Sequence, residues 1–91
     1  RSRDDHLFTV LIDAVCTGIN DVEAAESLRA FDAERTVSVL RGRTSGAEPD
    51  VRLRIAQALG EIEPSAAGEL LTELSTDEDE ATARTARRLL H

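Results

Sequence analysis

The chain has 91 residues, which is enough for one small domain with a modest hydrophobic core. Its apolar share is 41%, but its only aromatic residues are Phe8 and Phe31, so the core must be aliphatic and the stacking of bases or sugars on rings is disfavoured. The 18 acidic residues outnumber the 11 basic residues, all of them arginine, and the net charge of −7 argues against binding to nucleic acid or to an anionic membrane.

The acidity has two explanations, a partner with a basic surface or an adaptation for solubility, including solubility at high salt, and we favour solubility. The single cysteine, Cys16, cannot form an internal disulfide and suits a reducing compartment, so we expect a cytoplasmic protein. The apolar run 7–19 is too short and too interrupted to span a bilayer, and it lacks the cleavage pattern of a signal peptide. The first residue is Arg1 rather than methionine, which suggests a processed or excised segment.

The first predicted helix follows Asp4 and Asp5, and its apolar residues trace a broad helical stripe. Gly18 and Asn20 then supply the chemistry of a helix end and of a cap. The stripe consists of Leu7, Phe8, Val10, Leu11, Ala14 and Val15. A second helix is predicted over about 21–31. Its apolar positions, three residues apart, are Val22, Ala25, Leu28 and Phe31.

Four more helices are predicted after Asp32, which is expected to cap the first of them. The segment 42–48 has two glycines and no periodicity, so it is the longest predicted loop. Pro49 and Pro64 each suit the first turn of a helix. No segment alternates strongly enough to be a strand. The expected ranges are 33–41, 49–62, 64–74 and 78–90.

The apolar positions of the chain repeat. The set Val22, Ala25, Leu28 and Phe31 falls on Leu53, Ala56, Leu59 and Ile62 at an offset of 31 residues, and a weaker copy places Ala86 and Leu89 on Ala56 and Leu59. A period of this length indicates a helical array in which each unit buries its apolar face by stacking on its neighbours. The predicted units are a partial unit 4–19, repeats 20–47 and 48–76, and a partial unit 77–91.

Residues 50–62, Asp-Val-Arg-Leu-Arg-Ile-Ala-Gln-Ala-Leu-Gly-Glu-Ile, are followed by a second helix and the acidic turn 76–79. This pattern resembles the HEAT repeat, in particular the short form named for the phycobilisome lyases. The resemblance implies an all-α fold, a short α-α superhelix of about six antiparallel helices in a single domain, 1–91. The ladder of Asp–Arg contacts that such proteins often show is expected only around Asp50 and Arg52, because Glu23 stands where the family often has arginine.

No residue pattern in the chain is typical of catalysis, of a metal site or of a cofactor. The acidic run 77–80 lacks the alternation and the glycine of a calcium-binding loop, and it suits the capping of a helix instead. His6 and His91 lie at opposite ends of the sequence, and Cys16 occupies an apolar position. We therefore expect a protein that is not an enzyme and that binds neither a metal nor a cofactor.

Arginines gather in the last predicted helix. Glu80 and Arg84 are one helical turn apart, so an ion pair within this helix is expected. Arg84, Arg87 and Arg88, with Arg52 and Arg54, either form a small basic patch for an acidic partner or complement the dipole of the last helix, and we favour the dipole.

The remaining candidate is a protein-binding face on the solvated side of the two helices 33–41 and 64–74. Register pairs Ser38 with Glu69 and Arg41 with Thr72. The face consists of Glu34, Arg35, Ser38, Arg41, Glu69, Thr72 and Glu73. We predict a non-catalytic protein-interaction module or scaffold that presents a concave helical-repeat surface to a protein partner. The alternatives are an accessory subunit of a bilin-lyase-like enzyme and a DNA-binding solenoid.

The predicted array begins and ends on a partial unit, which leaves apolar helix faces uncovered at both ends. We therefore expect either a homo-oligomer that associates end to end or a part of a longer repeat array.

Overall fold

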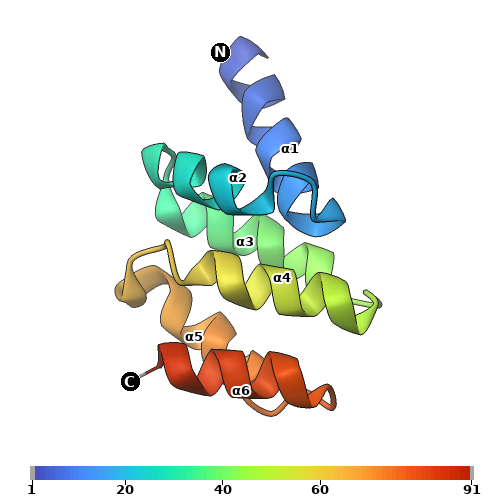
Figure 1. Cartoon of the computed structure of the whole chain (residues 1–91). Helices are drawn as coiled ribbons and strands as arrows, with labels where there is room; N and C mark the ends of the chain where they lie inside the picture. Colours follow the sequence, from blue (N-terminus) through green and yellow to red (C-terminus); the bar gives the residue numbers. More distant parts are fainter. Residues whose placement is uncertain (1, 91) are drawn as a thin grey trace.

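The computed structural model describes residues 2–90 and the side chains from Asp4 to Leu90. These residues form six α-helices and one short 3-10 helix, with no strand among them (Figure 1). The bounds are α1 Ser2–Thr17, α2 Asp21–Ser27, η1 Leu28–Ala30, α3 Ala33–Thr44, α4 Pro49–Leu59, α5 Pro64–Leu74 and α6 Glu80–Leu89. The all-α superhelical fold that the sequence predicts is confirmed.

The helices stack along one direction, which gives the molecule extents of 37 × 25 × 20 Å. In one layer α4 packs against both α2 and α6, and in the other α3 packs against α5. Helix α1 packs mainly on α2 and α4 at one end of the stack, and α6 lies at the other end (Figure 1).

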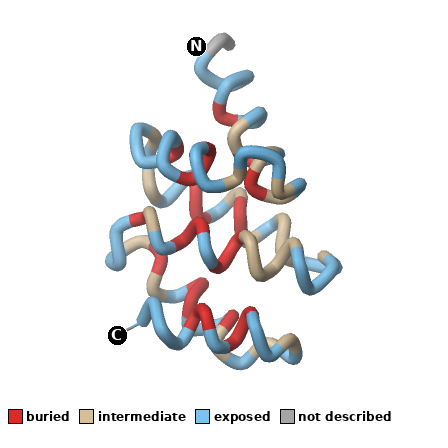
Figure 2. Tube along the Cα trace, in the orientation of Figure 1, coloured by how far each residue is buried: buried red, intermediate tan, exposed pale blue. Residues whose placement is uncertain are grey.

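Buried positions occur in every layer of the stack (Figure 2). The core that they form is a single cluster of mainly aliphatic side chains, with Phe8 as its one fully buried aromatic residue among those described. Leu28 of η1 and Leu59 of α4, the equivalent leucines of the two matching segments, are 1% and 0% exposed. Ala25 and Ala56 are buried beside them. The stacking of equivalent apolar positions that the repeat predicts is therefore present.

The apolar stripe predicted for the first helix is partly wrong. Phe8 and Val15 are buried as expected, but the third buried residue of α1 is Ile12, which the predicted stripe omits. Leu7 and Val10 are instead 48% and 46% exposed. Because α1 lies at the end of the stack and has neighbours on one side only, its buried arc is narrower than its apolar stripe.

Val22 is a second error in the predicted core, since it is 64% exposed although Leu53 matches it in the repeat. It lies in the first turn of α2, beside a shallow hollow that it lines with Arg54 and Gln57 of α4. A first-turn position at the edge of a helix pair has too few neighbours to cover its side chain.

Several helix ends differ from the predicted ranges. The second helix tightens into η1 before Phe31, and α4 ends at Leu59. Helix α3 continues to Thr44, whose Oγ1 donates to the carbonyl of Arg41 at 2.7 Å, so the loop shortens to 45–48. The predicted cap at Asp32 is confirmed, because its carboxylate accepts a hydrogen bond from the Arg35 amide at 2.9 Å.

Gly18 ends α1 with a φ of +82°, in the left-handed region that disfavours side chains. An added Cβ would also lie 3.1 Å from Cδ of Arg54. We expect Gly18→Ala to lower the free energy of unfolding by about 1–2 kcal/mol. Gly42→Ala is the matched control: it lies inside α3, where a Cβ meets open space, and should raise stability by about 0.5–1 kcal/mol. Thermal denaturation followed by circular dichroism measures both, and equal effects would contradict this account.

Candidate functional site

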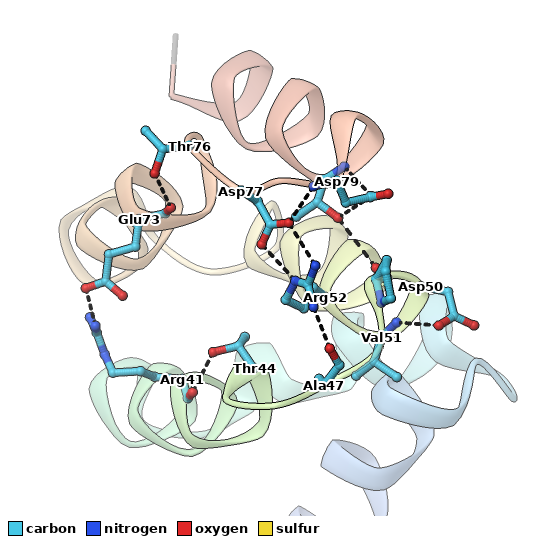
Figure 3. Close-up of polar contacts among 12 residues, drawn as sticks. Arg41, Thr44, Ala47, Asp50, Val51, Arg52, Glu73, Thr76, Asp77 and Asp79 are labelled. Carbon is cyan, nitrogen blue, oxygen red and sulfur yellow. Dashed lines mark hydrogen bonds and ion pairs between the residues drawn. The ribbon is translucent and has the colours of Figure 1, made fainter.

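The exposed side of α3 and α5 carries an arginine between two carboxylates. Arg41 of α3 is ion-paired with Glu73 of α5 (Figure 3). Its second terminal nitrogen lies 3.8 Å from Oε1 of Glu69. Glu69 and Glu73 are one helical turn apart on α5, so the guanidinium spans one turn of the neighbouring helix. We call these three residues the Arg41 cluster.

The hydrogen bond from Arg41 to Glu73 raises the pKa of the Arg41 guanidinium, and the charges of Glu73 and Glu69 act in the same direction against its partial desolvation. Arg41 therefore stays charged at all physiological pH values. The cluster is a fixed positive group flanked by two exposed carboxylates, an arrangement that can exchange ion pairs with an incoming charged chain.

The structure places all seven residues of the predicted binding face on the solvated sides of α3 and α5. Six are exposed and Arg41 is half-buried. Arg41 makes ion pairs with Glu69 and Glu73, which lie on either side of Thr72, its equivalent in the repeat register. Thr72 donates to the carbonyl of Gly68 at 2.8 Å within its own helix.

Arg35 belongs to a different part of the surface from the Arg41 cluster. Its Nη2 lies 3.3 Å from Oδ1 of Asp5, and its guanidinium carbon lies 4.2 Å from the centre of the Phe8 ring, so both contacts are with α1. Arg43 links the same two helices through Asp13 at 2.9 Å, and this hydrogen bond raises the pKa of Arg43. Ion pairs thus connect α1 to α3, and α3 to α5.

Arg52 of α4 makes the most buried ion pair among the described residues. Its Nε and Nη2 donate to the two carboxylate oxygens of Asp77 at 2.8 and 3.0 Å, and its Nη1 donates to the carbonyl of Ala47 (Figure 3). The side chains of Arg52 and Asp77 are 20% and 11% exposed. This pair joins the loop before α4 to the turn before α6.

The Asp–Arg contact expected around Asp50 and Arg52 is therefore present at Arg52, but Asp50 is not part of it. Arg52 binds Asp77, whereas Asp50 lies 3.7 Å from Arg54 and accepts from its neighbour's amide. The acidic run before α6 acts as its sequence suggests, since the carboxylate of Asp79 accepts from the Thr82 amide at 3.0 Å and caps α6. Among the described residues no group of three or more His, Cys, Asp or Glu is placed to hold a metal ion.

Cys16 and His6 lie ten residues apart on α1 and do not form a common cluster. Cys16 is half-buried against the core, with Nη1 of Arg43 3.7 Å from its sulfur, and its carbonyl accepts from Nη2 of Arg54 at 2.6 Å. His6 is exposed on α1, and His91 lies outside the described residues. Within α6 the expected ion pair is present, with Arg84 3.3 Å from Glu80.

The structure contains a groove of about 440 Å³ between α1 and α2 that the sequence did not predict. Val10 and Ile19 are exposed along it, and Asp13 and Glu23 are among the residues that line it. The sequence signal is Ile19, a large apolar residue in a short turn between two helices. None of the described helices has both the length and the apolar character that crossing a bilayer requires.

Comparison with known proteins agrees with this architecture. The family model for HEAT repeats matches residues 17–90, from the end of α1 to the end of α6. No curated protein and no solved structure gives a significant match. The match covers most of the chain and the same helices that stack in the structure, and the chain therefore belongs to the HEAT-repeat family.

Proposed function

We propose that the chain is a non-catalytic protein-interaction module that binds its partner on the exposed side of α3 and α5. HEAT repeats generally mediate contacts between proteins, and stacked helical repeats present extended surfaces for this purpose. The Arg41 cluster is the observation that carries the proposal. It places fixed charges of both signs across two neighbouring helices at the surface.

The chemistry of this face favours a polar partner segment over an apolar one. No large apolar residue is exposed on the described α3 or α5, so apolar contacts there would contribute little to the binding of a partner. Carboxylates outnumber guanidinium groups among the seven residues of the face, so it is mildly acidic. The expected partner is an extended protein segment that carries basic side chains, with an acidic residue to meet Arg41.

Two further assignments accompany this proposal. We assign complete repeats to 20–47 and 48–76 and partial units to 4–19 and 77–91. Arg29 of η1 lies 3.5 Å from Glu61, which follows α4, and this contact between the two proposed repeats supports their stacking. The free thiol of Cys16 suits a reducing compartment, which supports a cytoplasmic location.

Arg41→Glu tests the face directly. The variant replaces the central cation by an anion beside Glu69 and Glu73, so we expect loss of the partner that the wild-type chain captures in an affinity pull-down. Arg29→Glu is the matched control, because Arg29 is also an exposed arginine paired across two repeats, with Glu61. Arg35 is unsuitable for this test, since its reversal would also disturb its contacts with α1.

The expected result is a specific partner retained by wild type and Arg29→Glu and released by Arg41→Glu, with binding that weakens as salt increases. If Arg41→Glu captures the same partner as wild type, the binding face lies elsewhere on the molecule. Circular dichroism of each variant shows that the comparison is made between folded proteins.

A further inference from the structure

A continuous apolar groove runs along one side of α1, at the end of the stack far from α6 (Figure 1). The groove between α1 and α2 is lined only by these two helices and the turn between them. A second hollow, between the first half of α1 and the turn that leads into α3, shares Leu11 and Ser27 with it, so the two form one surface. We call the two hollows together the end groove. Its exposed large apolar residues are Leu7, Val10 and Ile19.

The end groove lies on the outer side of the α1–α2 pair. Val10, Ala14 and Thr17 line it at spacings of four and three residues, so they share one face of α1. At about 100° per residue this face is roughly opposite to the face of Ile12 and Val15, which are buried in the core. Helix α4 packs against both α1 and α2. The pair therefore already holds one helix against it and has a second groove on its outer side.

The end of the molecule that carries the groove is acidic. Residues 4–28 contain six carboxylates and neither lysine nor arginine; the six are Asp4, Asp5, Asp13, Asp21, Glu23 and Glu26. Of the two that line the α1–α2 part, Asp13 is paired with Arg43, whereas Glu23 makes no ion pair with another described residue. A carboxylate without a cation, beside exposed apolar side chains, favours a segment that combines apolar with basic side chains.

The described helices of this chain do not supply such a segment. Helix α6 is the richest in arginine, but Leu89 and Leu90 line a hollow with residues of α4 and α5, and so lie on its inner side. Its outer side carries charged residues such as Arg84 and Arg88 and no large apolar residue. Two end grooves in contact would bring like charges together. The occupant that fits is therefore a segment of a different protein.

The walls of the groove favour a helix over an extended strand. Both walls are helices, whose backbone groups are hydrogen-bonded within each helix, and the described residues include no strand edge that an extended segment could join. A helical segment satisfies its own backbone groups and needs only side-chain contacts. The wall from Leu7 to Thr17 is about 15 Å long at the rise of an α-helix, which matches about three turns of a partner helix.

We propose that the end groove binds an amphipathic, basic α-helix of another protein. The apolar stripe of this helix, with residues three and four positions apart, lies against Leu7, Val10 and Ile19. Lysine or arginine side chains beside the stripe pair with Glu23. This is a second binding surface, beyond the one proposed on α3 and α5, and it uses no residue of the Arg41 cluster.

Fluorescence anisotropy of a labelled model peptide tests this proposal. The probe is a 14-residue peptide of leucine and lysine whose leucines recur at helical spacing. It should bind wild type with a Kd on the order of 10 µM, and more weakly as salt increases. One control peptide alternates the same residues and so has no apolar helical face, and a second carries glutamate in place of lysine. Each control should bind about tenfold more weakly or less.

A matched pair of variants locates the site. Val10→Lys and Val22→Lys make the same change in net charge, but Val22 is an exposed valine that lines a different hollow, between α2 and α4. Val10→Lys should weaken binding of the peptide by about tenfold or more, and Val22→Lys by less than about threefold. Ile19→Lys serves as a second groove variant if circular dichroism shows that Val10→Lys is not folded. Arg41→Glu should bind the peptide as wild type does.

Four results would overturn the proposal. Equal losses in Val10→Lys and Val22→Lys would mean that charge alone attracts the peptide to this end of the molecule. Equal binding of the three peptides, or no binding, would mean that the groove does not recognise a basic amphipathic helix. Loss of peptide binding in Arg41→Glu alone would place the peptide on α3 and α5. Self-association of wild type in sedimentation velocity, abolished by Val10→Lys, would make a second copy the occupant.

Discussion

Leu59→Ala is expected to lower the free energy of unfolding by about 3 kcal/mol. Leu59 is 0% exposed and lies on α4, the helix that packs against both α2 and α6. Its truncation removes apolar contacts and leaves a cavity that helices held on two sides cannot easily fill. Denaturation by urea, followed by circular dichroism, measures the loss as a lower midpoint.

Leu28 and Leu89 provide the matched comparison, because they occupy the equivalent position in the other two copies. Leu28 is 1% exposed, so Leu28→Ala should cost about as much as Leu59→Ala. Leu89 is 37% exposed, and Leu89→Ala should cost about 1 kcal/mol or less. Equal losses in all three variants would mean that burial in the stack does not set the stability of these positions.

The repeat could be predicted because it depends on local spacing. Ala25 and Leu28, and likewise Ala56 and Leu59, lie three residues apart on one face of a helix, and that face is buried wherever a neighbouring helix is present. The predicted stripe of the first helix contains more apolar positions than its neighbours cover. Whether Ile12 or Val10 is buried depends on which helices pack against α1. The spacing of apolar residues within α1 does not predict those neighbours.

The polar contacts could be predicted only in part. Capping by Asp32 and Asp79 and the pair of Glu80 with Arg84 are local, so sequence spacing is sufficient for them. The partners of Arg41 and Arg52 are not local. Arg41 pairs with Glu69 and Glu73, on either side of its register equivalent Thr72, and Arg52 binds Asp77 because the loops before α4 and α6 bring the two together.

Arg52→Met is expected to lower the free energy of unfolding by about 2–3 kcal/mol, although methionine retains most of the apolar stem. The variant leaves the carboxylate of Asp77, which is 11% exposed, without its cation. It also leaves the carbonyl of Ala47 without the donor that holds the loop before α4. The exposed pair of Arg84 with Glu80 is the control, and Arg84→Met should change stability by less than about 0.5 kcal/mol.

The pH dependence separates the ion pair from the packing of the arginine stem. The hydrogen bonds from Arg52 hold the pKa of Asp77 below its ordinary value, against the opposing effect of burial. Because this pKa is lower in the folded than in the unfolded chain, the pair stabilises fully above about pH 4, and the stabilisation is lost as the pH falls through the folded value. Wild type should therefore lose more stability than Asp77→Asn between about pH 5 and pH 3.

A double variant shows whether the cost comes from the unpaired charge. In Arg52→Met with Asp77→Asn no buried carboxylate remains without a cation, so its loss of stability should be smaller than the sum of the two single losses. Strictly additive losses would mean that Arg52 and Asp77 stabilise the fold independently. In that case the junction between α4 and α6 would depend on the packing of their apolar side chains rather than on this ion pair.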